Sequence, residues 1–173
     1  MPARADDIQL NRLGLQSGEA KVFEFEVDLG NFTFGDQQYS ADPRIAPVTV
    51  DVARMVGNGW ALRLRVAATL RGPCMRCLDP ATMPIDVDAR EVDQPGEIDD
   101  FDSPYVVDDE LDARRWAHEA FALAVPAQIL CRTDCAGLCP VCGADMNADR
   151  EHAHEPEPDP RWAALDEIGR AHV

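Results

Sequence analysis

Apolar and polar side chains alternate along the segment Trp60-Ala61-Leu62-Arg63-Leu64-Arg65-Val66. Successive side chains of a β-strand point to opposite faces of a sheet, so this alternation predicts a strand with one buried and one wet face. The triplet Gly57-Asn58-Gly59 precedes it and supplies turn chemistry, because these residues tolerate positive φ. The stretch is therefore expected to follow a turn in an antiparallel arrangement.

The same alternation occurs in three other segments, at 22–28, 47–52 and 85–88. Residues 20–93 therefore predict a meander of antiparallel strands, in a barrel-like sheet with one wet face.

Helical spacing of apolar residues begins near residue 108. It predicts a helix over about 108–126, started by Asp108 or Asp109 and ended by Pro126. Its apolar stripe contains Trp116 and Phe121, which we expect to pack on the sheet.

The expected fold class is α+β, with an antiparallel sheet, one packed helix and a small C-terminal zinc-ribbon-like segment. Residues 1–130 are predicted to form a β-rich domain that includes an acidic loop at about 93–107 and the helix. Residues 131–173 are predicted to hold the Cys/His zinc-binding segment and a tail, with a short final helix at 161–165.

Charge limits the function. The chain has 32 acidic and 16 basic residues and a net charge of -16, which opposes non-specific binding to phosphate backbones. No run of about 18 apolar residues occurs, so we expect no membrane span. The segment 1–7 lacks the apolar region of a signal peptide, which predicts a cytoplasmic protein. The oligomeric state is not indicated.

Acidic residues are concentrated between Asp86 and Asp112, a segment with twelve acidic residues and a single basic residue, Arg90. Such a block is typical of a solvated linker or strand edge. It also fits a contact for a basic partner, such as an arginine- and lysine-rich ribosomal protein. The candidate contact residues are Asp99, Asp100, Asp108 and Asp109.

The six cysteines indicate metal binding, because thiols stay reduced in the cytosol. The strongest signal is Cys139-Pro140-Val141-Cys142-Gly143, a knuckle that offers two of the four ligands of a tetrahedral zinc. The other two ligands are either His152 and His154, which we slightly favour, or Cys131 and Cys135. A mixed set, such as Cys135 with one histidine, is a further alternative.

A second Cys-x-x-Cys, formed by Cys74 and Cys77, follows a predicted strand. It allows three interpretations: a structural thiol pair on a hairpin, a metal or partner contact, or a redox pair. A redox role needs a βαβ context, which the flanking antiparallel strands do not offer.

Three segments together carry a family resemblance. They are Gly72–Leu78, the Asp-Glu-Leu at 109–111 that leads into a helix ending Ala-Val-Pro at 124–126, and Leu130–Asn147 with its four cysteines. With Asp159–Leu165, they make the chain similar to the YceD family of bacterial large ribosomal RNA subunit accumulation proteins, which has plastid relatives. The resemblance implies Cys-x-Cys in many relatives where this chain has His152-Ala153-His154, a replacement that keeps metal-ligand chemistry.

The resemblance implies a non-enzymatic factor needed for 23S ribosomal RNA accumulation and large-subunit assembly. With the acidic region, it suggests an adaptor that binds a basic ribosomal protein or a large-subunit precursor, and 23S rRNA only indirectly. One alternative is a zinc module that binds RNA directly through a basic strip. Another, weaker alternative is a zinc or dithiol enzyme. The strip would consist of Arg63, Arg65, Arg71 and Arg76, unless these pair with Glu24, Glu26 and Asp28 across strands.

Overall fold

The computed structural model describes residues 7–94 and 101–155 of the 173-residue chain. The chain divides into two compact units, Met1–Cys135 and Ala136–Val173. The division falls after Cys135, so Cys131 and Cys135 belong to the first unit.

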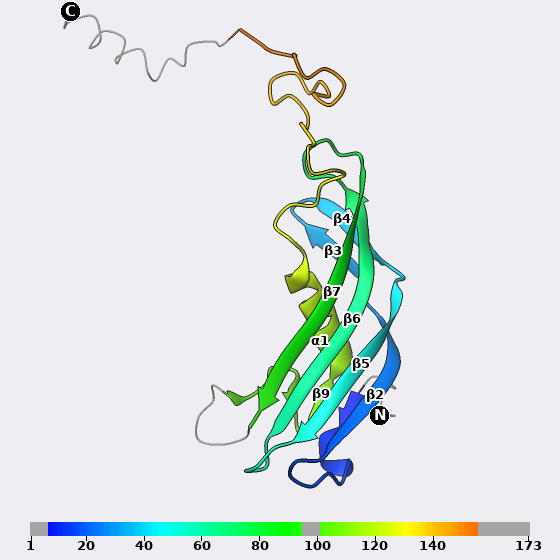
Figure 1. The fold of residues 1–173 in the computed structure, drawn as a ribbon, viewed down its shortest axis with the longest axis vertical. Coiled ribbons are helices and arrows are strands. Elements are labelled where there is room, and N and C mark those ends of the chain that lie inside the picture. The colour runs from blue at the N-terminus through cyan, green and yellow to red at the C-terminus, as the bar shows by residue number, and fades with distance from the viewer. Residues whose placement is uncertain (1–6, 95–100, 156–173) are drawn as a thin grey trace, which may run out of the picture. The chain divides into compact units, whose positions relative to one another are not determined.

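Four long antiparallel strands form the main sheet of the first unit, as the alternating segments predict. They lie in the order β2-β5-β6-β7, with β6 between β5 and β7 (Figure 1). Leu62, Leu64 and Val66 of β6 are buried on the inner face, while Arg63 and Arg65 alternate with them on the outer face. The strands are β2 (Ala20–Asp28), β5 (Ile45–Arg54), β6 (Trp60–Pro73) and β7 (Pro80–Asp93).

A hairpin that the sequence did not predict, β3 (Asn31–Phe34) and β4 (Gln37–Asp42), joins the same sheet. β5 pairs with β6 only as far as Val66, and β4 then pairs with Thr69–Arg71 on the same side of β6. The sheet stays open rather than barrel-like, because β2 and β7 do not pair with each other in the part of the chain described.

The helix α1 (Ala113–Ala124) starts five residues later than expected. A second small sheet takes up the preceding residues, with the order β1-β9-β8. The cap of α1 is Asp112, whose side chain accepts a hydrogen bond from the N–H of Arg115 at 2.8 Å, so the expected caps Asp108 and Asp109 were wrong. The strands of this sheet are β1 (Asp7–Gln9), β8 (Val106–Val107) and β9 (Glu110–Asp112), and a 3-10 turn (Leu10–Arg12) follows β1.

The core lies between α1 and the inner face of the main sheet (Figure 1). Trp116 and Phe121 are 1% and 0% exposed, which confirms that these two residues of the apolar stripe pack inward. Phe121 contacts Phe32 of β3 with ring centroids 5.2 Å apart. The unpredicted hairpin therefore covers part of the helix.

The second unit contains little regular structure within its described residues, 136–155. Leu138 and Asp145 form an isolated antiparallel bridge. The short helix expected at 161–165 lies outside the described residues. Among the helices described in either unit, none has the length and apolar character needed to cross a membrane.

Candidate metal centres

The turn between β6 and β7 has the form of a metal-binding knuckle and is built by backbone hydrogen bonds. The N–H of Cys74 donates to the carbonyl of Asp79 at 2.7 Å, and the N–H of Leu78 donates back to the carbonyl of Cys74 at 3.0 Å. Leu78 has a φ of 65°, the left-handed conformation that reverses the chain here. The turn places Cys74 and Cys77 on one side, where both thiols can reach a single ion.

The same turn occurs again in the second unit. The N–H of Cys139 donates to the carbonyl of Ala144, and the N–H of Gly143 donates to the carbonyl of Cys139, both at 2.8 Å. Gly143 has a φ of 74° and so takes the position that Leu78 has in the first knuckle. Both Cys-x-x-Cys motifs therefore have one local structure, although only the second carries the glycine typical of it.

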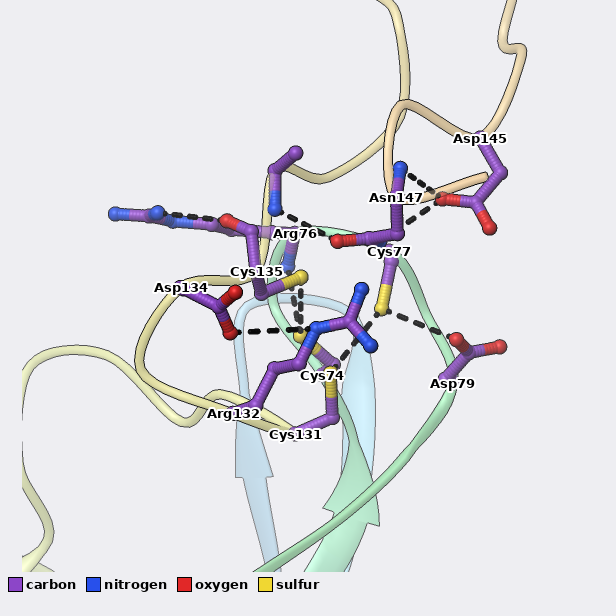
Figure 2. Close-up of polar contacts among 11 residues, drawn as sticks. Cys74, Arg76, Cys77, Asp79, Cys131, Arg132, Asp134, Cys135, Asp145 and Asn147 are labelled. Carbon is purple, nitrogen blue, oxygen red and sulfur yellow. Dashed lines mark hydrogen bonds and ion pairs between the residues drawn. The ribbon is translucent and has the colours of Figure 1, made fainter. Parts of the chain in front are cut away.

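Four cysteines gather in the first unit, and Figure 2 shows their sulfurs converging. The Sγ atoms of Cys74 and Cys135 lie 3.8 Å apart, and those of Cys77 and Cys131 lie 3.6 Å apart. All four sulfurs lie within 4.8 Å of one another. The structure thus brings Cys131 and Cys135 to the Cys74–Cys77 knuckle, which the sequence had left without a partner. We call this set the four-cysteine centre.

Hydrogen bonds hold the segment after α1 against this knuckle. The N–H of Met75 donates to the carbonyl of Ile129 at 2.8 Å, and Ile129 is completely buried. The guanidinium of Arg76 donates to the carbonyl of Cys135 at 2.9 Å and to the side chain of Gln128 at 3.1 Å. These contacts position the third and fourth thiols.

The second unit has a centre of its own. His152 and His154 place their Nε2 atoms 3.2 and 3.3 Å from the Sγ of Cys142 and 3.0 Å from each other. Together with Cys139, these ligand atoms all lie within 4.8 Å of one another. The structure therefore places the two histidines, rather than Cys131 and Cys135, at the Cys139–Cys142 knuckle. We call this set the Cys/His centre.

Both donor sets fit a four-coordinate ion. A tetrahedral zinc with Zn–S bonds of about 2.3 Å sets its sulfurs about 3.8 Å apart, and shorter Zn–N bonds of about 2.0 Å bring nitrogens closer. The sulfur separations of 3.6 and 3.8 Å match the first value. The distances involving histidine nitrogens are shorter, in the expected direction.

Backbone amides favour a thiolate at the first cysteine of each knuckle. Burial raises the pKa of Cys74, but hydrogen bonds from amides, including that of Arg76 (N to Sγ, 3.5 Å), lower this pKa to about 6. The amides of Cys142 and Val141 lower the pKa of Cys139 to about 6. Because the thiolate is the metal-binding form, these amides favour metal binding by the first thiol of each knuckle.

The candidate acidic contacts fall in two places. Asp108 and Asp109 form the exposed two-residue turn between β8 and β9, with φ values of 52° and 62°. Two positive φ angles make a type I′ hairpin turn, for which aspartate is a suitable residue. Asp99 and Asp100 lie outside the described residues.

The four arginines of the expected basic strip all have partners. Arg76 binds the carbonyl of Cys135 and the side chain of Gln128. The other three pair with aspartates on strands next to β6, and not with the β2 residues Glu24, Glu26 and Asp28, because β5 separates β2 from β6. The pairs are Arg63–Asp88 (2.6 Å), Arg65–Asp51 (3.0 Å) and Arg71–Asp42 (2.8 Å to Nε).

The chain resembles proteins of known sequence over most of its length. Rv2926c of Mycobacterium tuberculosis is 36% identical over 121 residues, which cover 65% of this chain and 57% of the relative. ML1660 of Mycobacterium leprae is 28% identical over 71% of this chain and 59% of its own length. YlbN of Bacillus subtilis is 28% identical over 92% of both chains. The chain thus spans less than two thirds of the length of these mycobacterial relatives.

No solved structure matches the chain. A family model described as "Large ribosomal RNA subunit accumulation protein YceD" matches residues 62–168, which include both centres. The chain therefore belongs to the YceD family.

Proposed function

We propose that this protein is a non-catalytic, zinc-stabilised factor in the accumulation of large-subunit ribosomal RNA, acting in the cytoplasm by binding a basic ribosomal protein or precursor. The observation that carries the proposal is that each centre offers four protein ligands. Structural zinc sites are closed in this way, whereas catalytic sites keep a position open for water or substrate. A zinc or dithiol enzyme is therefore the weaker alternative.

Zinc is the ion that we assign to both centres. Four thiolates, or two thiolates and two imidazoles, are the donor sets of structural zinc, while magnesium and calcium take oxygen ligands. Burial raises the pKa of Cys131, which disfavours its thiolate unless a positive charge compensates. Zinc binding then releases protons and stabilises the fold.

Charge supports a protein partner over direct contact with RNA. The net charge of -16 repels a polyanion and attracts a cationic protein. The arginines that would contact phosphates are already bound to carboxylates or backbone carbonyls. Binding of RNA by these arginines would have to break the existing pairs, which would reduce the binding free energy.

The test is affinity capture with the zinc-loaded full chain at low and at physiological salt, each with and without nuclease. We expect ribosomal proteins to be retained after nuclease treatment and to be lost as salt rises. Capture of 23S RNA that resists removal of proteins, and is lost in Arg63→Ala with Arg65→Ala, would replace the proposal with direct RNA binding.

A further inference from the structure

β7 is an edge strand with one unused side. All fourteen of its residues pair with β6, and no other strand of the described chain pairs with it (Figure 1). An edge of this length carries a row of backbone donors and acceptors that a further strand can bind.

The parity of the free backbone groups follows from two hydrogen bonds. The carbonyl of Asp79 accepts a hydrogen bond from the N–H of Cys74 across the turn. The backbone N–H and carbonyl groups of odd-numbered residues of β7 therefore point to β6. Gln94, just beyond β7, donates its N–H to Phe101, so even-numbered residues face the other way. Pro84 agrees with this parity, because a proline has no N–H to give to β6. The N–H and carbonyl groups of Asp86, Asp88 and Arg90 therefore point to the free edge.

A groove runs along this edge between β7 and α1, with a volume of about 380 Å³. Val87 and Ala89 form its sheet side, and Trp116 and Leu123 form its helix side. Leu123 is 83% exposed although it is a large apolar residue in the last turn of α1. A strand added to β7 would place every second side chain over this groove, where it would cover Leu123.

The outer face of the same edge carries two aspartates, followed by Arg90. Asp86 and Asp88 are exposed on the outer face of β7, and Asp86 makes no ion pair within the described residues. Asp88 is bound to Arg63 but remains 47% exposed on its side chain. Positively charged side chains on an added strand, placed opposite these aspartates, would stabilise its pairing with β7.

We propose that the free edge of β7 binds an extended segment of a basic protein by strand addition, with lysine or arginine beside Asp86 and Asp88 and apolar residues in the groove. The class of partner rests on the proposed function; the edge, the groove and the charge do not. A second copy of this chain is the poorer occupant, because antiparallel pairing of two β7 strands centred on Asp86 and Asp88 sets aspartates opposite aspartates.

The probe is an eight-residue blocked peptide of alternating lysine and valine, with a peptide of four lysines followed by four valines as its control. Binding to the zinc-loaded full chain is measured by fluorescence anisotropy and by amide hydrogen exchange. We expect the alternating peptide to bind more tightly than the block peptide and to protect the amides of Asp86, Asp88 and Arg90. Equal binding of the two peptides, or protection elsewhere only, would overturn the proposal.

Substitutions separate the backbone from the charge. Asp86→Pro removes the carboxylate and the N–H at the free edge while leaving the β6 ladder intact, and Asp86→Asn removes only the charge. We expect affinity to fall by about tenfold or more in the proline variant and by less in the asparagine variant. Glu24→Pro is the matched control. It removes a carboxylate and a backbone N–H at the opposite edge of the sheet, where β2 pairs only with β5. Equal losses in Asp86→Pro and Glu24→Pro, with both variants folded by thermal melting, would refute strand addition.

The two proposals fail in different ways. Ribosomal-protein capture that survives Asp86→Pro would leave the proposed function standing and overturn this docking site. Peptide binding without any capture of ribosomal proteins by the parent chain would overturn the proposed function and leave the site. A dimer in sedimentation that Asp86→Pro dissociates would replace the basic segment with a second copy of the chain.

Discussion

Leu78 and Gly143 occupy the same position in two copies of one turn. Each lies four residues after the first cysteine of its knuckle, has a positive φ of 65° or 74°, and donates its N–H to that cysteine's carbonyl. The left-handed conformation costs a non-glycine residue about 1 kcal/mol or more. The first knuckle therefore keeps a strain that the second avoids.

Leu78→Gly should be more stable than Leu78→Ala by about 1 kcal/mol, because both variants lose the same side chain and only glycine relieves the backbone. Urea unfolding of the two zinc-loaded variants measures the difference. Val92 is an exposed residue of β7 without positive φ, so there the order of stability should be reversed. Val92→Ala should be more stable than Val92→Gly. The same order at both positions would contradict the strain.

Each centre should hold its own zinc. The parent chain should contain about two zinc ions, and Cys74→Ser or Cys142→Ser should each reduce this to about one. Cys74 is completely buried, so its loss should also lower the melting temperature of the first unit. Cys142→Ser should leave that transition unchanged. Metal analysis and calorimetry on reduced protein test both statements, and loss of both ions from a single substitution would contradict independent centres.

Gly72 is a packing site directly before the four-cysteine centre. A Cβ at this position would lie 2.1 Å from Cδ1 of Tyr39, a buried residue whose hydroxyl donates to the carbonyl of Pro73 at 3.0 Å. Gly72→Ala should therefore destabilise the protein by about 3 kcal/mol. Gly35→Ala, which adds a Cβ in open space at positive φ, should cost only about 1 kcal/mol. Equal costs in urea unfolding would show that Tyr39 moves aside freely.

Asp93 should make stability depend on pH. Burial raises the pKa of its carboxyl group, so between the ordinary pKa of 3.8 and the folded value the native state binds more protons than the unfolded state. The contribution of Asp93 to the free energy of unfolding therefore falls as pH rises through this window. Asp93→Asn keeps an acceptor for the N–H of Ser103 and should gain stability relative to the parent as pH rises.

Asp28→Asn is the opposite control for Asp93. Its ion pair with Arg44 lowers the pKa of Asp28, so the stability it gives is present at neutral pH and lost as pH falls. Urea unfolding should give slopes of opposite sign for the two variants, each relative to the parent: below pH 3.8 for Asp28→Asn and above pH 3.8 for Asp93→Asn. Slopes of one sign would contradict the assigned environments.

Asp108 and Asp109 test the adaptor proposal. Asparagine tolerates positive φ, so changing both to asparagine should remove two charges and keep the turn, with stability unchanged within about 0.5 kcal/mol. Association with captured ribosomal proteins should become slower and less sensitive to salt. Asp36→Asn, another exposed turn aspartate, measures the effect of net charge alone. If the association rate changed equally per charge removed at Asp36 and at Asp108 and Asp109, this would count against a specific contact.

The sequence predicted the long strands because their signal is local: the side chains of β6 and β7 alternate residue by residue. The hairpin β3–β4 was missed because its strands are short, although Phe32, Phe34 and Tyr39 alternate with polar residues on either side of Gly35-Asp36. The start of α1 was misplaced because Asp108 and Asp109 form a turn of their own. The proximity of Cys131 to Cys77 could not be predicted from their spacing. It depends on where the segment after α1 packs against the β6–β7 turn. A usable signal was the number of ligands: six cysteines with His152 and His154 make two sets of four.

The separation of the ligands along the chain sets the order in which the two centres can be completed. In the Cys/His centre only 10 and 12 residues separate Cys142 from His152 and His154, so a short nascent segment suffices. In the four-cysteine centre 54 and 61 residues separate the paired thiols, and both β7 and α1 lie between them. Closing that longer loop costs more chain entropy than closing the shorter one. A zinc ion bound by all four of these thiols would therefore require that synthesis of the chain had passed Cys135, the last residue of the first unit.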